Sequence, residues 1–297
     1  MNKRTEDNFA ALIDQYDDLK FALLEAQTFD PIHFGFPPLY YQIMESDQER
    51  VGAFQRAFAL YDFHNKVVCE AGVGRLALTR FYLPFVKHAY LIEHNPDLRS
   101  TIEAVIAQNN WQDKVTLLFD DARTVVLPEP IDTLIGEMMS IFCANEYQVQ
   151  VFQHLRQYLR PEGTLFPQRI INLAQLAQVD FSTSPNHYPI NFTRHLPTVL
   201  SGQVAVNTIA LMKEVEQEVN IQQPVTALLS GEVNALCLRS FVEISPGINF
   251  TGTDSLMPPT VLKLAHSQAV ETGATYQLKG HFKYGTSLDD AVFWLEK

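Results

Sequence analysis

The stretch that decides the fold is Val67-Val68-Cys69-Glu70-Ala71-Gly72-Val73-Gly74-Arg75-Leu76. Its apolar first half is typical of a buried strand in a parallel sheet. Gly72 and Gly74 are typical of the turn that leads from such a strand into a helix, where a missing Cβ lets the backbone approach a ligand. The stretch therefore predicts a nucleotide-binding βαβ unit.

A second apolar run supports this prediction. Residues 90–92 read as another buried strand, and this strand ends in Glu93. A carboxylate that follows the glycine turn by about 20 residues is placed to accept the two ribose hydroxyls of an adenosine. Glu93 is therefore predicted to bind a nucleotide ribose.

The glycine pattern alone does not choose between cofactors. Gly72-x-Gly74-x-x-Ala77 also fits the fingerprint of NAD-binding proteins, which is a weak signal by itself. Glu70 favours S-adenosylmethionine (SAM), because a carboxylate at the end of this strand suits the cationic amino group of SAM and repels a pyrophosphate. An NAD-dependent oxidoreductase stays open as an alternative.

Two further strand ends carry acids. Asp121 and Ala122 follow the apolar run 115–119, where a methyltransferase sheet places the groups that read adenine. The strand 133–135 ends in Glu137, close to the expected position of the reactive methyl group. Ligands of parallel sheets bind at the carboxyl ends of the strands, so these positions converge on one SAM site.

At this point the chain resembles the protein arginine methyltransferases of the SAM-dependent Rossmann type. Glu137 and Glu146, nine residues apart, resemble the two glutamates of the family's acidic loop. Met44-x-x-Asp47-x-x-Arg50 is similar to a family helix motif, which implies that Arg50 holds the SAM carboxylate. Leu159–Pro167 resembles the family's turn into a β-barrel, and His33-Phe34-Gly35 resembles another family segment.

The resemblance is incomplete at four places. Leu76 stands where the family has a third glycine, and Arg123 stands where it has an acid that meets adenine, so Asp121 is expected to serve instead. The paired tyrosines of an N-terminal motif are missing. The family's T-H-W loop, which helps to wall the arginine pocket, is absent, and we expect its position at residues 256–260.

Composition limits the partners. The formal net charge of −12 argues against a nucleic-acid partner, which needs a basic surface, and is compatible with a cationic substrate. Cys69, Cys143 and Cys237 are widely spaced and suggest neither disulfides nor a zinc site, so we expect a cytoplasmic protein without a bound metal. No signal peptide or membrane-spanning run is apparent.

The predicted fold is α/β, a Rossmann-type SAM-dependent methyltransferase domain followed by a mostly antiparallel β-barrel or sandwich. Amphipathic periodicity predicts helices at 7–27 and 39–60, and we expect residues 1–60 to form a helical segment that covers the SAM site. The SAM-binding domain is expected at 61–167. It has strands near 66–70, 88–93, 114–119, 131–136 and 163–166, and helices near 75–84, 96–109 and 146–159.

Residues 168–297 are predicted to be a β-rich substrate or dimerisation domain. Short β-branched runs separated by turn residues support this, near 170–173, 204–206, 235–238, 241–244, 261–264 and 291–295. The stretch 182–202 lacks a regular pattern. It fits either an insertion that forms a homodimer, as the resemblance implies, or a plain surface loop.

The predicted activity is SAM-dependent N-methylation of a guanidino group, on arginine in free, peptide or protein form or on an arginine-derived metabolite. A guanidinium is a poor nucleophile because its lone pairs are delocalised. Two carboxylates, Glu137 and Glu146, can orient it and localise its charge on a nitrogen that is not attacked. Alternatives are methylation of another amine or hydroxyl of a small molecule, and a non-catalytic SAM-fold partner subunit.

Overall fold

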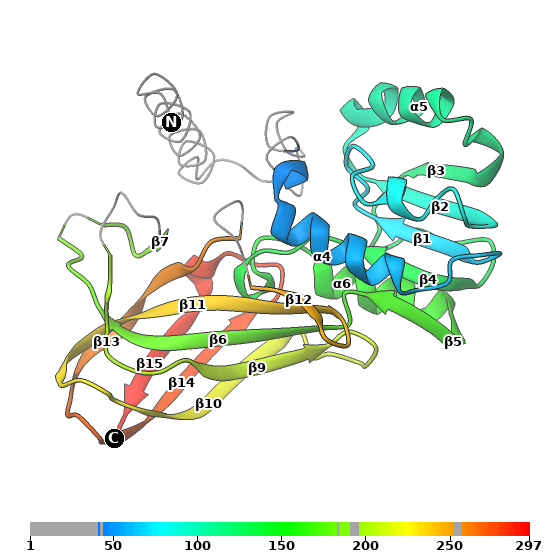
Figure 1. The fold of residues 1–297 in the computed structure, drawn as a ribbon. Helices are drawn as coiled ribbons and strands as arrows, with labels where there is room; N and C mark the ends of the chain where they lie inside the picture. The colour runs from blue at the N-terminus through cyan, green and yellow to red at the C-terminus, as the bar shows by residue number, and fades with distance from the viewer. Residues whose placement is uncertain (1–40, 42–43, 183, 191–195, 252–256) are drawn as a thin grey trace, which may run out of the picture.

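The computed structural model describes residue 41 and residues 44–182, 184–190, 196–251 and 257–297. The helix predicted at 7–27 lies outside these residues, as do His33 and most of the segment 1–60 that is expected to cover the SAM site. Figure 1 shows an α/β part and a β-rich part that lie side by side. None of the described helices is long and apolar enough to cross a bilayer.

The α/β part is built around one parallel sheet. It comprises α4 (Gln48–Ala59), β1 (Val67–Ala71), β2 (His88–Glu93), α5 (Arg99–Gln108), β3 (Val115–Phe119), β4 (Ile131–Gly136), α6 (Gln148–Leu155) and β5 (Leu159–Phe166). The strand order is β3-β2-β1-β4-β5, and all neighbours are parallel. Every residue of β1 is buried, as its apolar sequence predicts for a central strand.

The strand order fixes where a ligand binds. From β1 the chain moves outward to β2 and β3, and it then returns to β4 on the other side of β1. The connections therefore leave β1 and β4 in opposite directions and open a crevice outside their carboxyl ends. This arrangement confirms the predicted Rossmann-type core.

The helix predicted at 75–84 is wrong. Leu76 has φ +67°, a left-handed conformation that cannot continue a right-handed helix, and only a short 3₁₀ turn forms at Thr79–Phe81. The side chains explain this path. The hydroxyls of Thr79 and Tyr82 both donate to Oε2 of Glu70, each at 2.6 Å, and the segment folds back toward the end of β1.

Other predicted boundaries shift by a few residues. The helix expected at 146–159 is α6, Gln148–Leu155, followed by a 3₁₀ turn at Arg156–Tyr158. Strand β5 begins at Leu159 rather than near 163, because Leu159 already pairs with Ile131 of β4 before a register shift. Helix α4 begins after Asp47, whose carboxylate accepts the backbone N–H of Arg50 at 3.1 Å and caps the helix.

The second part is almost entirely antiparallel. It comprises β6 (Arg169–Gln178), β7 (His187–Pro189), β8 (Thr198–Val199), β9 (Val204–Ala210), β10 (Glu218–Thr226), β11 (Gly231–Ser245), β12 (Ile248–Phe250), β13 (Thr260–Val270), β14 (Thr275–Lys283) and β15 (Val292–Glu296). One sheet has the order β7-β13-β11-β6-β8, with β9 and β12 attached, and the other has the order β10-β14-β15. The predicted mostly antiparallel β-domain is confirmed.

Two details of this part differ from the sequence prediction. The runs 235–238 and 241–244 belong to one strand, β11, because Arg239 and Ser240 continue the pairing with β6. Strands β7, β8, β10, β12 and β14 were not predicted. In β10 only Ile221 and Val225 are buried, so its sequence lacks an apolar run.

The two parts are joined at helix α4 and at the loop after β4. Glu49 of α4 accepts the backbone N–H of Thr251, just after β12, at 3.0 Å. Phe142, after β4, packs against Phe282 of β14 with a ring-centroid distance of 5.4 Å. Figure 1 shows helix α4 beside β12 of the β-rich part.

Candidate active site

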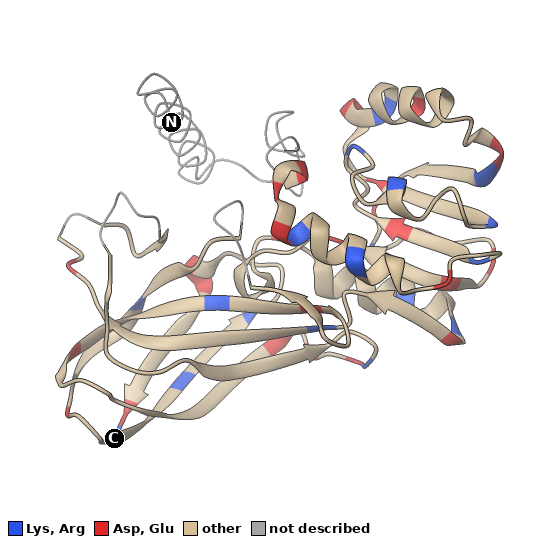
Figure 2. Ribbon diagram, in the orientation of Figure 1, with Lys and Arg blue, Asp and Glu red and all other residues tan. Residues whose placement is uncertain are grey.

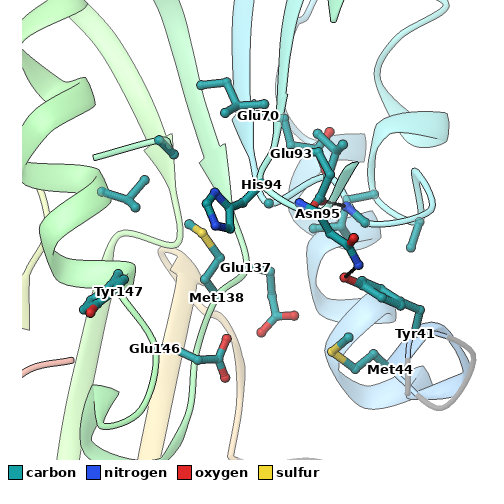
Figure 3. Close-up of a pocket in the computed structure, with 18 of the residues that line it drawn as sticks. Tyr41, Met44, Glu70, Glu93, His94, Asn95, Glu137, Met138, Glu146 and Tyr147 are labelled. Atoms are coloured by element: carbon teal, nitrogen blue, oxygen red, sulfur yellow. Dashed lines mark hydrogen bonds between the residues drawn. The ribbon is translucent and has the colours of Figure 1, made fainter. Parts of the chain in front are cut away.

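A cavity of about 200 Å³ opens at the carboxyl ends of β1, β2 and β4. Each residue that the sequence analysis selected lines it: Arg50, Glu70, Gly72, Gly74, Glu93, Asp121, Ala122, Glu137 and Glu146. Figure 3 shows several of these side chains around the cavity. The structure therefore brings together residues from four strand ends and from helix α4.

The glycine turn forms one wall of the cavity. Gly72 has φ +70° and Gly74 has φ +52°, a region that side chains rarely adopt. A Cβ at Gly72 would also lie 2.8 Å from Cγ of Met138. The turn therefore requires glycine at position 72 for two independent reasons, and it leaves the backbone open to a ligand.

Glu93 sits at the base of this turn. Its Oε2 accepts the backbone N–H of Gly74 at 2.8 Å, and its Oε1 accepts the backbone N–H of Asn95 at 2.8 Å. Burial raises the pKa of Glu93, and the backbone donors oppose this effect. Each carboxylate oxygen can accept one more hydrogen bond, so the side chain supports the turn and still has capacity for a ligand hydroxyl.

Glu70 is more enclosed. Its Oε2 accepts the two hydroxyls that fold back from Thr79 and Tyr82, and burial raises its pKa to about 7. One oxygen therefore holds the turn, and any contact with a ligand amino group depends on the other oxygen.

Asp121 is held by its neighbour. Arg123 donates from Nε and Nη2 to the Asp121 carboxylate at 2.6–3.0 Å, and this pairing lowers the pKa of Asp121. The same guanidinium lies 3.9 Å from the ring centroid of Tyr147. Arg123 therefore connects the end of β3 to the segment that follows Glu146.

Arg50 reaches the cavity from helix α4. Its Nη1 donates to Oε2 of Glu137 at 3.0 Å, and its Nε lies 3.4 Å from Asp47. Burial lowers the pKa of Arg50, but Glu137 and Asp47 outweigh it and the net shift is upward. Within the described part of the chain, Nη2 of Arg50 and Oε1 of Glu137 are buried without a hydrogen-bond partner.

Glu146 is the second acid of this region. Burial, and then the charge of Glu137, raise its pKa to about 8, while Arg50 opposes the shift. Figure 3 shows the carboxylates of Glu137 and Glu146 directed toward the same space. A cation placed there would meet both carboxylates and would favour the ionised form of Glu146.

Residues 137–146, which we call the acid loop, have an irregular backbone. Phe142, Cys143 and Asn145 all have positive φ, between +51° and +61°. The side chain of Gln148 braces the beginning of the loop, since it accepts the N–H of Met138 at 2.9 Å and donates to the carbonyl of Gly136. The loop is thus held in a defined shape.

The β-rich part contributes backbone hydrogen bonds to the acid loop. Asn145 donates its N–H to the carbonyl of Thr286 at 3.0 Å, and Gly285 donates to the carbonyl of Cys143 at 2.8 Å. Thr260, at the end of the segment where the family's T-H-W loop is expected, pairs with β11 and β7. The place of that loop at residues 256–260 stays a prediction, and residues 285–286 are an additional, unpredicted neighbour of the acid loop.

Comparison with known proteins agrees with this geometry. Residues 38–166 match the family model described as PRMT5 arginine-N-methyltransferase. Over these residues the chain is similar to the protein arginine methyltransferases. The histone-arginine methyltransferase CARMER of Culex quinquefasciatus is 30% identical over 131 residues, which cover 43% of this chain and 22% of that protein.

The probable histone-arginine methyltransferase CARMER of Drosophila melanogaster is 29% identical over 129 residues, 42% of this chain and 24% of that protein. The arginine methyltransferase-like match thus spans less than a quarter of these curated relatives.

Solved structures of arginine methyltransferases share the fold over most of the chain. The Trypanosoma brucei PRMT1 enzyme-prozyme heterotetrameric complex with AdoHcy has a TM-score of 0.70 at 14% identity, covering 81% of this chain and 86% of that one. Arabidopsis thaliana protein arginine methyltransferase 10 has a TM-score of 0.66 at 14% identity, with 82% and 87% covered. The arginine methyltransferase-like architecture therefore includes the β-rich part, where sequence similarity is low.

Several cavity residues of this arginine methyltransferase-like chain were not predicted. Tyr41, His94, Asn95, Met138 and Tyr147 line the cavity, and Asn95 Nδ2 lies 3.4 Å from the Tyr41 hydroxyl. A positional signal existed for three of them. His94 and Asn95 directly follow the strand-end acid Glu93, and Tyr147 directly follows Glu146.

Proposed function

We propose that this chain transfers a methyl group from SAM to a guanidino nitrogen, with protein or peptide arginine as the leading acceptor class. The observation that carries the proposal is the placement of Arg50 and the two acids. A guanidinium is already bound to Glu137, beside a second carboxylate and next to the glycine turn. The acid loop is therefore chemically suited to guanidinium ions.

The cavity fits SAM at each of its polar ends. Glu93 supports a ribose, and Gly72 and Gly74 leave the backbone accessible beside it. Asp121 and Ala122 border the adenine end. Nη2 of Arg50, buried without a hydrogen-bond partner in the described residues, suits the SAM carboxylate. Oε1 of Glu70, the oxygen that does not accept from Thr79 and Tyr82, suits the SAM amino group. When bound, SAM supplies an electrophilic methyl group on a sulfonium.

The acid loop would prepare the acceptor. Glu137 and Glu146 would bind two nitrogens of a guanidinium and localise positive charge away from the nitrogen that attacks. This nitrogen forms the new N–C bond as the C–S bond breaks and its electrons return to sulfur. The attacking nitrogen then releases one proton, and Glu146 is the proposed acceptor because its pKa is raised to about 8.

The overall charge supports a cationic acceptor. The chain has a formal net charge of −12. Figure 2 shows Lys and Arg residues distributed over both parts of the described structure rather than gathered in one region. A positively charged peptide would meet favourable long-range electrostatics on approach.

Two measurements test the proposal in sequence. Isothermal titration calorimetry with SAM, S-adenosylhomocysteine and NAD tests the cofactor, and binding of NAD alone would contradict the SAM assignment. Transfer from methyl-labelled SAM is then measured with arginine, an arginine peptide, and the matched peptide with lysine in place of arginine. Transfer to the lysine peptide or to a hydroxyl compound would retain the SAM site and overturn the guanidino assignment.

The other predictions from the sequence remain proposals. SAM binding without transfer to any acceptor would favour a non-catalytic partner subunit, for which Arg123 and the left-handed Leu76 are the motivating departures. The division at residues 60 and 167, a homodimer and a cytoplasmic location also stay predictions. The three cysteines are buried and free, which fits a reducing compartment.

A further inference from the structure

The middle of the acid loop has a conformation that needs support. Phe142 has φ +61° and Cys143 has φ +51°, although both carry a Cβ. Left-handed geometry at a bulky residue is uncommon and persists only where the surroundings impose it. Phe142 is fully buried and packs against Phe282 and Phe293 of the β-rich part. The source of that support lies in the second part of the molecule.

A chain of side-chain hydrogen bonds starts at this loop. The backbone N–H of Phe142 donates to Oγ of Ser240 at 2.9 Å, and Ser240 donates to Oδ1 of Asn172 at 2.7 Å. Nδ2 of Asn172 donates to Oδ1 of Asn207 at 2.8 Å, and Nδ2 of Asn207 donates to the hydroxyl of Tyr284. The chain crosses from β11 through β6 and β9 to the residue after β14.

The hydrogen bonds of this chain run in one direction. The backbone N–H of Phe142 donates to Ser240, and the Ser240 hydroxyl donates to the carbonyl of Asn172. The amide group of Asn172 then faces the carbonyl of Asn207, and the amide group of Asn207 faces the Tyr284 hydroxyl. A network in which each member satisfies the next stabilises one arrangement of the groups at its ends.

The far end of the chain returns to the same loop. The residue after Tyr284 is Gly285, whose N–H donates to the carbonyl of Cys143 at 2.8 Å. A Cβ on Gly285 would lie 2.6 Å from the ring of Tyr147, and its φ is +71°, so only glycine allows this approach. The two ends of the network therefore contact the loop at the N–H of Phe142 and next to the carbonyl of Cys143, on either side of the peptide bond that joins these residues.

We propose that Ser240, Asn172, Asn207 and Tyr284 are positioning residues that hold the acid loop in the shape required for acceptor binding. They act through the backbone of Phe142 and Cys143 on the carboxylates at the two ends of the loop. The inference rests on the proposed function for its catalytic consequence. The loop geometry that it explains can be measured without any activity.

The test compares two buried serines that have the same bonding pattern. Ser201 accepts the N–H of Leu176 at 2.8 Å and donates to the carbonyl of Gly202, but its hydrogen bonds do not lead to the acid loop. Ser240→Ala and Ser201→Ala therefore remove equivalent bonds. Hydrogen–deuterium exchange at the Phe142 amide is measured in both variants, together with SAM affinity and steady-state methyl transfer to an arginine peptide.

Ser240→Ala should speed exchange at Phe142 and lower kcat/KM for the peptide by about tenfold or more, with SAM affinity within about twofold. Ser201→Ala should leave exchange and kcat/KM unchanged even where its melting temperature falls equally. Tyr284→Phe, at the far end, should give a smaller change of the same kind as Ser240→Ala.

Three outcomes would overturn the inference: unchanged exchange in Ser240→Ala, faster exchange with normal kcat/KM, or an equal loss of kcat/KM in Ser201→Ala. Absence of transfer by the unaltered protein would reject the proposed function instead. Exchange at Phe142 would then still decide whether the network holds the loop.

Discussion

Arg50 and Glu137, 87 positions apart in sequence, are joined by a hydrogen bond of 3.0 Å between Nη1 and Oε2. Glu137 therefore has a cation of the protein itself as its partner. Arg50 affects the pKa of Glu146 less than burial and the charge of Glu137 do. The two acids that the sequence presents as a symmetric pair are thus unequal in the folded chain. Their substitution should have unequal effects.

We predict that Glu146→Gln lowers turnover by roughly two to three orders of magnitude, about 2.7–4 kcal/mol of transition-state stabilisation, while SAM affinity stays nearly intact. Shape and most hydrogen bonds survive, but the charge that orients the acceptor is lost. Glu137→Gln should lower turnover similarly and also weaken SAM binding, because it removes one of the two carboxylates that hold buried Arg50. Calorimetry and single-turnover kinetics separate these effects.

Glu162→Gln, at an exposed position of β5, is the control for this pair. Normal turnover in both acid-loop variants would show that these carboxylates are structural.

We predict that kcat/KM for a cationic acceptor rises with pH and has a midpoint of about 8, because Glu146 must be ionised to bind the cation and its pKa is raised to about 8. Since guanidinium groups stay protonated well above this range, the acceptor does not titrate. Glu146→Gln should flatten the profile. A profile that falls between pH 6 and 8, or one unchanged in the variant, would contradict this assignment.

The same shift has a consequence for stability. A carboxyl with a folded pKa of about 8 and an ordinary value of 4.5 binds more protons in the folded than in the unfolded chain between these limits. Its contribution to the free energy of unfolding therefore falls as pH rises through this window. Compared with the unaltered protein, Glu146→Gln should lose less thermal stability between pH 5 and 8.

We predict that Glu93→Ala weakens SAM binding by about 1–3 kcal/mol, through loss of charge-assisted hydrogen bonds to the ribose. It should also lower the melting temperature of the ligand-free protein, because the N–H groups of Gly74 and Asn95 lose their acceptor. Glu103→Ala, exposed on α5, is the control. Unchanged SAM affinity in a folded Glu93→Ala protein would limit Glu93 to supporting the turn.

We predict that Gly72→Ala destabilises the protein by more than Gly247→Ala and abolishes detectable SAM binding. Both glycines have positive φ, +70° and +78°, so both substitutions carry a backbone penalty of about 1 kcal/mol. Only Gly72 faces an obstacle, Met138 Cγ at 2.8 Å, whereas nothing lies within 4 Å at Gly247. Equal losses in urea unfolding would mean that Met138 moves freely.

The sequence predicted the structure best where a continuous apolar run marks a strand and an acid marks the end of that strand. Central parallel strands are buried on both faces, so β1 appears as a continuous apolar run, and the acid at the end of a neighbouring strand identifies the ligand side. Glu93 and Glu137, selected by this argument, line the cavity, and their roles there stay predictions.

The predictions failed where a segment depends on residues distant in sequence, or where only scattered residues of a strand are buried. The segment after Gly74 avoids a helix because Thr79 and Tyr82 bond to Glu70, which periodicity does not reveal. Strand β10 buries only scattered residues, so its composition reads as polar. The contact of the acid loop with residues 285–286 depends on the complete β-rich part and has no local signal.

The contacts of Gly285 and its neighbours also limit the order in which the parts of the cavity can form during synthesis. Gln150 donates to the carbonyl of Tyr284 at 2.8 Å, and these residues are 134 positions apart. Because synthesis proceeds from the N-terminus, the parallel strands and the glycine turn that line the cavity leave the ribosome long before residue 285. The nascent chain can thus form the glycine turn and its strands while the acid loop still lacks its hydrogen-bond partners from residues 285–286.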